Sequence, residues 1–363
     1  MRHCHVTLSY LEPGNNALMT GLALLANRGE LRLSIEVTTP PAPLTEGPWH
    51  LRDKAESGIR LTLDGARSAY VDVHDSWEID ALARQRHDLY FKRSFDPQRV
   101  PAAKFPTLRP LGLVNDVRRD GFDAWELRRI LAQRVSARER LRDGARFVLD
   151  SLAAMVDRGP RPNLALLQAP PDTDSEPSVL FMAGVWDPAR VPEDEPDKAA
   201  EFDAINETRA ACVRLLRSAF GERFFGGLMH SEFAARRYPD VLLPEARAAS
   251  KRAYVQRVRR SAICVATRGL HGSNGWKLAE YVGLSRAIVT EPLQYAVPGD
   301  FAAGHNYHEF AAPEACVERV GSLLENPAQR KAQMQANWKY YNRWMRPDSL
   351  ARHVVDQLER RPA

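Results

Sequence analysis

The sequence predicts an α/β protein built from two Rossmann-like domains, and three observations lead to that prediction. The chain has 363 residues, too many for one average domain and suitable for two. In both halves, short apolar runs alternate with helical patterns, as in a mainly parallel sheet covered by helices. A stretch rich in Pro and Asp, residues 158–177, separates the two series. We therefore expect one domain over residues 1–172 and another over residues 173–363.

In the first domain, apolar periodicity of two or 3.6 residues identifies the elements. Strands are expected at residues 5–10, 31–38, 59–63, 69–73, 88–92 and 108–114. Helices are expected at residues 16–26, 76–86 and 123–156, the last broken near Ser136 or Gly144.

The second domain is expected to repeat the same alternation. Its strands are expected at residues 179–185, 224–229, 262–266 and 287–290, and its helices at residues 198–220 and 247–260 and after residue 275. Two or three further helices follow residue 314, and these terminal helices could pack back on the first domain.

Composition narrows the class of protein. Hydrophobic residues make up 44% of the chain and charged residues 27%, as in ordinary soluble enzymes. The formal net charge of +5 is small and spread along the chain, which argues against a nucleic-acid partner. The basic run at residues 251–260 is interpreted as a solvated helix face.

The four cysteines stand far apart, without the paired spacing of a metal site or a disulfide framework. They are Cys4, Cys212, Cys264 and Cys316. Reduced, buried thiols of a cytoplasmic protein fit this pattern best. No apolar run has the length of a membrane span, and a modest basic surface allows a peripheral membrane contact without predicting one.

The segment 269–291, GLHGSNGWKLAEYVGLSRAIVTE, carries the strongest functional signal. Gly272 and Gly275 allow the backbone to approach an anion closely, and the N-terminus of the following helix offers free N–H groups and a positive dipole end. Glu280 stands about one turn into that helix, where it can accept hydrogen bonds from ribose hydroxyls. The order of turn, helix and strand is what a nucleotide-diphosphate site needs, although the turn alone would be equally consistent with tight packing.

Several sequence words resemble bacterial GT-B glycosyltransferases, which use nucleotide sugars. They are KLAEYVGLSRAIVTEPL at residues 277–293, AGHNYHEF at 303–310 and ENPAQRKAQMQANWKYY at 325–341, with DLYFKRSF at 88–95 the one familiar word of the first half. The resemblance covers about residues 261–344. It implies GT-B architecture, with two Rossmann-like domains, a deep interdomain cleft and C-terminal helices.

The resemblance also implies roles for single residues. Glu280 would hold the donor ribose, and Lys277 or Arg268 would supply countercharge to the diphosphate. His271 stands where several inverting members place a phosphate-contacting His. Four residues would meet the diphosphate itself: Gly272, Ser273, Asn274 and Gly275. Retaining members carry a second Glu at the place of Gly272, so inversion is favoured here.

Inversion needs a base that removes the proton of the acceptor hydroxyl. The best candidates are His74 and Asp75, which follow an expected strand of the first domain, where side chains face the crevice of an open sheet. A simple helix cap by Asp75 or Ser76 is the alternative interpretation, and both roles can hold at once. At the end of another expected strand, Lys92 and Arg93 either reach a phosphate or an acidic acceptor, or are ordinary charges at a strand end.

The sequence thus predicts a cytoplasmic, metal-independent glycosyltransferase that moves a sugar from a nucleotide diphosphate to an acceptor hydroxyl. Such an enzyme is expected to need no metal and no cofactor, because helix N-termini and basic side chains can stabilise the departing diphosphate. The acceptor stays open between a polysaccharide, a lipid-linked sugar, a protein and a small metabolite. The alternatives are a nucleotide-sugar epimerase of the same fold and a non-catalytic nucleotide-binding protein.

Overall fold

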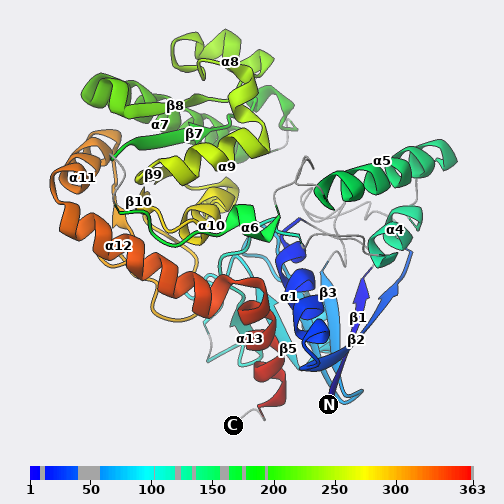
Figure 1. The fold of residues 1–363 in the computed structure, drawn as a ribbon. Coiled ribbons are helices and arrows are strands. Elements are labelled where there is room, and N and C mark those ends of the chain that lie inside the picture. The colour runs from blue at the N-terminus through cyan, green and yellow to red at the C-terminus, as the bar shows by residue number, and fades with distance from the viewer. Residues whose placement is uncertain are drawn as a thin grey trace. The chain divides into compact units, whose positions relative to one another are not determined.

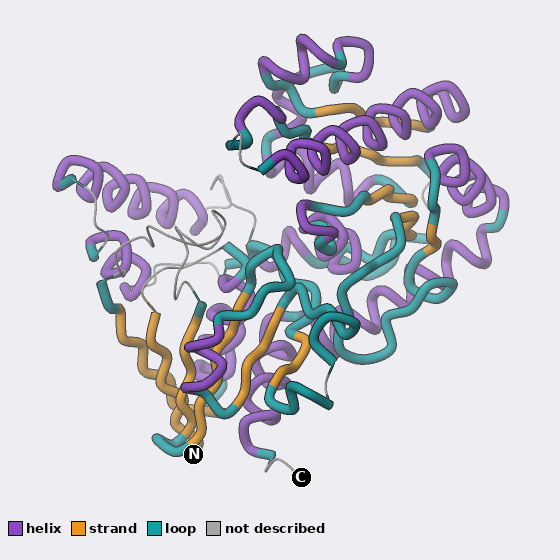
Figure 2. Tube along the Cα trace, turned by 180° about the vertical axis from the view of Figure 1, so that it is seen from behind, coloured by secondary structure: helices purple, strands orange, loops and turns teal. Residues whose placement is uncertain are grey.

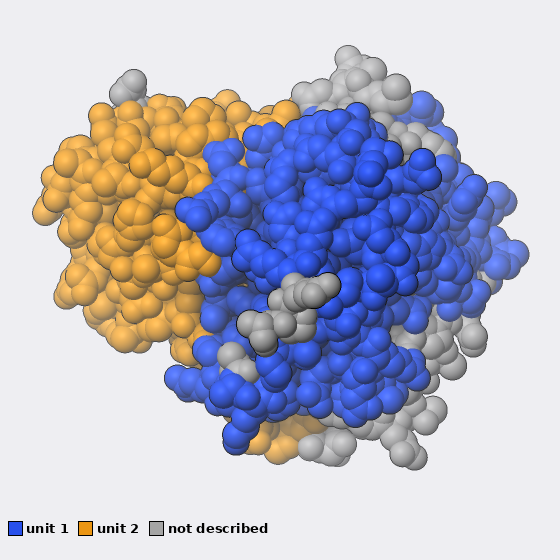
Figure 3. All heavy atoms as spheres, turned by 90° about the horizontal axis from the view of Figure 1, so that it is seen from below, with its two compact units in different colours: residues 1–164, 295–298, 342–363 blue, residues 165–294, 299–341 orange. Residues whose placement is uncertain are grey.

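The computed structural model describes most of the chain. The described residues are 1–8, 13–39, 58–101, 103–118, 124–132, 136–155, 163–173, 177–192 and 195–360. They divide into two compact units (Figure 3). Unit 1 comprises residues 1–164, 295–298 and 342–363, and unit 2 comprises residues 165–294 and 299–341.

The units differ from the expected domains in three ways. Their main division lies at residues 164 and 165 rather than 172 and 173, and two segments of the expected second domain, 295–298 and 342–363, belong to unit 1. Helix α6 (Leu164–Leu167) spans the division. The fold class is confirmed, because each unit is an α/β structure with one sheet (Figure 2).

Unit 1 is built on a six-stranded sheet of order β2-β1-β3-β4-β5-β6. The strands are β1 (Arg2–Leu8), β2 (Leu31–Val37), β3 (Ile59–Leu63), β4 (Arg67–Asp72), β5 (Leu89–Lys92) and β6 (Leu108–Pro110). The sheet is mainly parallel, as expected, because β1–β2, β4–β5 and β5–β6 are parallel pairs. The exception is β3, which runs antiparallel to both β1 and β4. The reason is local: β3 and β4 are joined by a tight turn in which Asp64 and Gly65 both have positive φ, so the pair forms a hairpin.

The helices of unit 1 are α1 (Asn15–Asn27), α3 (Ala81–Arg86), α4 (Ala124–Leu131), α5 (Ala137–Met155) and α13 (Pro347–Glu359), as labelled in Figure 1 where there is room. The predicted break near Ser136 is confirmed, whereas Gly144 lies inside α5. The C-terminal helix α13 packs against α1 so closely that a Cβ atom on Gly21 would lie 1.8 Å from the carbonyl oxygen of Pro347. Arg28 and Asp348, 2.7 Å apart, link the same two helices.

The helix expected at residues 76–86 begins five residues later than predicted, at Ala81. Its N-cap is Asp80, whose carboxylate accepts a hydrogen bond from the backbone N–H of Ala83 at 2.9 Å. The capping interpretation of Asp75 and Ser76 is therefore wrong, because a better cap stands nearer the helix.

Unit 2 is built on a five-stranded, fully parallel sheet of order β11-β10-β9-β7-β8. The strands are β7 (Val179–Ala183), β8 (Phe224–Leu228), β9 (Ile263–Ala266), β10 (Ala287–Thr290) and β11 (His308–Glu309). Strands β7, β9 and β10 are buried at every position, as continuous apolar runs predict for a sheet covered on both faces.

The α-helices of unit 2 are α7 (Pro196–Phe220), α8 (Glu232–Arg237), α9 (Lys251–Arg260), α10 (Trp276–Gly283), α11 (Pro313–Glu325) and α12 (Pro327–Tyr340). Shorter turns are η1 (Pro188–Arg190), η2 (Gly221–Arg223), η3 (Pro239–Val241), η4 (Ala246–Ala249) and η5 (Leu270–Gly272), and the π-helical turn η6 (Tyr341–Met345) follows α12. The helix expected at residues 247–260 is thus two elements, η4 and α9.

Candidate functional site

The candidate site lies in unit 2, at the carboxyl ends of β7 and β9. The chain moves from β7 to β8 on one side and places β9 on the other side of β7. Such a reversal of strand order is a topological switch point, where open parallel sheets bind ligands. The loops that follow these two strands therefore form the first place to look for a ligand site in this unit.

Two polar side chains of α7 reach this edge of the sheet. Asn206 and Arg209 occupy the buried face of α7 together with Phe202, Val213 and Leu216, at spacings of four and three residues. The amide of Asn206 accepts a hydrogen bond from the backbone N–H of Trp186 at 3.0 Å and donates to the carbonyl of Trp186 at 2.7 Å. Asn206 thereby fixes the loop that follows β7.

The guanidinium of Arg209 bridges the ends of the two strands. It donates to the carbonyl of Gly184 at 2.7 Å, to the hydroxyl of Thr267 at 2.9 Å and to the carbonyl of Arg268 at 3.0 Å. Its plane lies over the indole of Trp186, with the guanidinium carbon 4.5 Å from the ring centroid. Residue Arg209 is 7% exposed, and this burial lowers its pKa to about 10, although Glu291 acts in the opposite direction.

These three hydrogen bonds of Arg209 do not use all the N–H donors of its guanidinium. A guanidinium has five N–H bonds, and the three contacts above use one on Nε and one on each terminal nitrogen. The other N–H of each terminal nitrogen has no hydrogen-bond partner within the described part of the chain. The bonds of these two nitrogens are part-buried, and N–H groups on neighbouring guanidinium nitrogens are donors that suit an oxyanion. Sequence reasoning missed Arg209, although an Arg on the apolar face of a helix was a signal that could have revealed it.

The glycine-rich turn after β9 is the second part of the site. His271 and Gly272 both adopt positive φ, 58° and 67°, and the backbone N–H of His271 donates to the carboxylate of Glu201 in α7 at 2.5 Å. Gly275 is the N-cap of α10 and offers no side-chain cap to the first N–H groups of that helix. Ser273 and Asn274 are buried. The turn thus leads into a helix whose N-cap residue, Gly275, has no side chain that could accept from the first N–H groups.

Lys277 lies in the first turn of α10 and is half-buried. Its ammonium donates to the carbonyl of Met182 in β7 and lies 5.2 Å from the ring centroid of Tyr254. Burial and the nearby charge of Arg209 lower the pKa of Lys277 to about 7, while Glu280 acts in the opposite direction. The two cations are thus close enough to repel each other, and an anion beside them would relieve that repulsion.

The other two predicted charges have acidic or basic partners. Glu280 is 4% exposed, and its Oε1 atom pairs with the ammonium of Lys251 in α9. Arg268 pairs with Glu291 at 3.2 Å, and its backbone N–H donates to the same carboxylate at 2.8 Å. The structure therefore brings the side-chain charge of Lys277, rather than that of Arg268, toward the buried guanidinium of Arg209.

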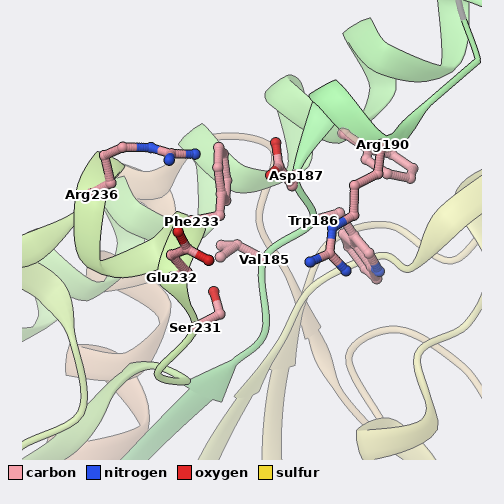
Figure 4. A pocket seen from close by; sticks show the side chains of 9 residues that line it. Val185, Trp186, Asp187, Arg190, Ser231, Glu232, Phe233 and Arg236 are labelled. Carbon is pink, nitrogen blue, oxygen red and sulfur yellow. The ribbon is translucent and has the colours of Figure 1, made fainter.

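A pocket of about 300 Å³ lies next to this edge, at the carboxyl ends of β7 and β8 (Figure 4). Trp186 and Arg190 lie on one side of it, and Glu232, Phe233 and Arg236 on the other. Trp186 also stacks on Arg209, so a single side chain joins the pocket to the buried guanidinium. The short turn η1 follows β7, and Asp187 caps it by accepting a hydrogen bond from the N–H of Ala189 at 3.1 Å.

In unit 1, the predicted polar residues gather at the carboxyl ends of β4 and β5. Asp72 is 3% exposed and Lys92 1% exposed, and their charged groups are 2.8 Å apart. The hydroxyl of Tyr90 donates to the same carboxylate oxygen at 2.5 Å. The charge of Lys92 lowers the pKa of Asp72 although burial acts in the opposite direction, and burial lowers the pKa of Lys92. Lys92 is therefore a buried partner of Asp72 rather than a charge at an exposed strand end.

The base candidates lie beside this pair. The backbone N–H of His74 donates to Oδ1 of Asp72 at 2.9 Å, which fixes the turn. Asp75 pairs with the buried guanidinium of Arg93, and its side chain is 38% exposed. An oriented, partly exposed carboxylate is suited to accept a proton, whereas Arg93 is engaged by that carboxylate.

Two further observations bear on the class of protein. Among the described residues, no three or more His, Cys, Asp or Glu side chains come together in a way that could hold a metal ion. Within the same residues, no helix is both long enough and apolar enough to cross a membrane.

No protein-family model matches the chain, and no curated protein is similar to it in sequence. Solved structures are similar at low identity. A putative UDP-N-acetylglucosamine 2-epimerase from Listeria monocytogenes is 11% identical, with a TM-score of 0.44 over 96% of this chain and 94% of that one. The S. aureus protein MnaA, solved with UDP, is 10% identical, with a TM-score of 0.45 over 99% and 96%.

A third similar structure is the C-terminal domain of a glycosyl transferase group 1 family protein (LpcC) from Francisella tularensis. It is 7% identical, with a TM-score of 0.31 over 50% of this chain and 97% of that one.

Proposed function

We propose that this protein is a GT-B glycosyltransferase that transfers a sugar from a nucleotide diphosphate to an acceptor hydroxyl, without a metal and with inversion. One observation carries the proposal: the buried guanidinium of Arg209 lies at the switch point of a parallel sheet, and each of its terminal nitrogens has one further N–H without a partner among the described residues. A diphosphate is the ligand that this position and these donors suit.

The surroundings of Arg209 support the same ligand. Burial and the charge of Arg209 together lower the pKa of Lys277. The N-terminus of α10 follows a turn in which two consecutive residues have positive φ. When the glycosidic bond breaks, its electron pair goes to the β-phosphate oxygen, and negative charge grows there. Two cations and a helix N-terminus aimed at that oxygen would stabilise the leaving group without a metal.

We assign the ribose contact to Glu280 and orientation of its carboxylate to Lys251. The pairing of Oε1 with Lys251 orients the carboxylate, and we assign its other oxygen to the ribose hydroxyls. His271, Ser273 and Asn274 belong to the same proposed site, next to the diphosphate.

We assign the role of general base, which accepts the proton of the acceptor hydroxyl, to Asp75 or His74. In an inverting transfer, the acceptor oxygen attacks the anomeric carbon from the side opposite the diphosphate and gives its proton to the base. The side chain of Asp75 is partly exposed and is oriented by Arg93, which favours it over His74. The acceptor class stays open, no cofactor is proposed, and the cytoplasm is the proposed location.

A panel of nucleotides tests the binding half of this proposal. Full-length protein is heated with UDP, GDP, dTDP or CDP, and the melting temperature is compared with that of the free protein. A ligand that binds the native state raises the melting temperature. We expect one of the four to do so. A flat response to all four would overturn the proposal and leave a non-catalytic protein as the better interpretation.

The reaction is tested separately with the matching nucleotide sugar. In the absence of any acceptor, a transferase leaves the donor largely intact or hydrolyses it slowly, and the sugar keeps its configuration at C2. An epimerase instead changes UDP-GlcNAc at C2 without an acceptor. Formation of the C2 epimer by the pure protein would overturn the transferase assignment while leaving the nucleotide site in place.

A further inference from the structure

Helices α4 and α5 of unit 1 pack against each other (Figure 1). Together they expose several large apolar side chains. Among the described residues, seven large hydrophobic side chains are exposed, and four of them belong to these two helices. They are Leu131, Leu141, Leu149 and Leu152, with exposed fractions of 47%, 74%, 67% and 57%. We call the three that lie on α5, Leu141, Leu149 and Leu152, the leucine face.

Helical geometry places the leucine face on one side of α5. Leu149 and Leu152 follow Leu141 by about two and about three full turns, so their side chains share a face. Exposed Ala145 lies between them. The buried face of α5 is a different one: it carries Gly144, Phe147 and Ser151, and Leu131 of α4 packs beside Gly144.

A row of arginines borders the leucine face. Arg138, Arg142 and Arg146 follow one another at four-residue spacing, one position after or three before the exposed apolar residues. The side chains of Arg142 and Arg146 are 69% and 79% exposed. Acidic residues lie further round the helix: Asp143 accepts a hydrogen bond from Arg142, and Asp150 lies 4.0 Å from Arg146. The arginines thus stand between the leucines and the acids.

We propose that the leucine face and its arginine row bind the surface of a membrane that contains anionic phospholipid. A contiguous exposed apolar patch marks an interaction site. A helix with an aliphatic stripe and a row of basic side chains lies in the boundary between headgroups and acyl chains, where guanidinium groups reach the lipid phosphates. The exposed side chains of this face are aliphatic, whereas the centres of protein–protein interfaces are enriched in aromatic residues, which favours a lipid over a protein partner.

The occupant is tested by co-sedimentation of the full-length protein with vesicles. We expect binding to vesicles of phosphatidylcholine mixed with phosphatidylglycerol, little binding to pure phosphatidylcholine, and weaker binding at high salt. Combining Leu141→Asp with Leu149→Asp is expected to lower the partition coefficient at least tenfold. Leu82→Asp is the matched control, because Leu82 is 58% exposed on α3 of the same unit and should change the coefficient less than twofold.

Three results would overturn the proposal. The wild-type protein could fail to bind anionic vesicles, or the double leucine variant could bind them as the wild type does. Alternatively, sedimentation velocity could show a dimer that the leucine variant disrupts, with no vesicle binding, and the face would then be a contact between copies of the chain. Should the leucine variant lose its thermal transition, Arg142→Glu with Arg146→Glu provides the test on two exposed side chains, with loss of binding to anionic vesicles expected and unchanged binding contradictory.

Discussion

Arg209 of α7 donates a hydrogen bond from Nε to the hydroxyl of Thr267, 2.9 Å away, at the end of β9. The same guanidinium holds the carbonyl of Gly184 at the end of β7. One side chain thus joins the two strands between which the order of the sheet reverses. Because a parallel sheet binds ligands at this point, the Arg209 guanidinium is central to the function we propose.

Replacing Arg209 separates a binding role from a structural one. Arg209→Lys keeps a positive charge but removes the planar fork that faces an oxyanion. We expect the affinity for the preferred nucleotide diphosphate, measured by calorimetry, to fall at least tenfold. Arg214→Ala is the matched control, since Arg214 lies on the same helix and pairs with exposed Asp240. A lower melting temperature with unchanged affinity would show that Arg209 is structural only.

Lys277 makes nucleotide binding depend on pH. Its pKa in the free protein is about 7, and a bound diphosphate would raise it, because the anion favours the charged form. Below pH 7 the ammonium is already charged, and affinity should be level. Above pH 7, binding must take up a proton, and affinity should fall by up to about tenfold per pH unit until the pKa of the complex is reached.

This proton uptake is measured by calorimetry at pH 8 in buffers of different ionisation enthalpy. The wild-type protein should show a buffer-dependent enthalpy, and Lys277→Met should not. The same slope in both proteins would exclude Lys277 as the group that titrates.

The buried pair of Asp72 and Lys92 should obey the rule for buried ion pairs. Lys92→Met leaves the carboxylate of Asp72 buried without its counter-charge, and we expect a loss of about 3–5 kcal/mol in the free energy of unfolding. Adding Asp72→Asn should recover a large part of that loss. Urea denaturation measures the free energy of unfolding of the single and double variants. A loss in the double variant equal to the sum of the losses in the two single variants would contradict the pairing.

Asp75 is expected to act in the reaction rather than in donor binding. Asp75→Asn should slow transfer by about 10²–10⁴-fold, the usual contribution of a general base. The thermal shift caused by the nucleotide should not change. Asp64→Asn, in the turn between β3 and β4, is the control, and an equal loss of rate in both variants would exclude Asp75 as the base.

The four cysteines should be unreactive in the native protein. All four are free and buried. Burial raises the pKa of the Cys4 thiol to about 12 and the pKa of the Cys264 thiol further still. Because the thiolate is the reacting form, Ellman's reagent at pH 8 should label the native chain slowly and all four positions rapidly in denaturant. Fast labelling of the native chain would contradict this burial.

Much of the fold could be predicted from the sequence, because the strands of unit 2 are continuous apolar runs between glycine- and proline-rich turns. The strand at residues 287–290 has the predicted bounds. The antiparallel strand β3 could not be predicted in the same way, since apolar alternation does not reveal strand direction. The start of α3 was misplaced because Asp75, Ser76 and Asp80 are all plausible caps, and only the path of the chain selects Asp80.

The site could be predicted only in part. The glycine-rich turn and Lys277 are local features of the segment 269–291, and their positions near β9 follow from that order. Arg209 lies 58 residues before Thr267 in the chain, so their contact depends on how α7 packs over the sheet. The pairing of Glu280 with Lys251 likewise joins two helices, α9 and α10, and no local pattern indicates it.

A crystal structure of the protein with the nucleotide diphosphate that raises its melting temperature tests the central claim most directly. We predict phosphate oxygens within hydrogen-bond distance of the two terminal nitrogens of Arg209, with the nucleotide at the carboxyl ends of β7 and β9. A nucleotide bound elsewhere, with Arg209 contacting only Gly184, Thr267 and Arg268, would contradict the account.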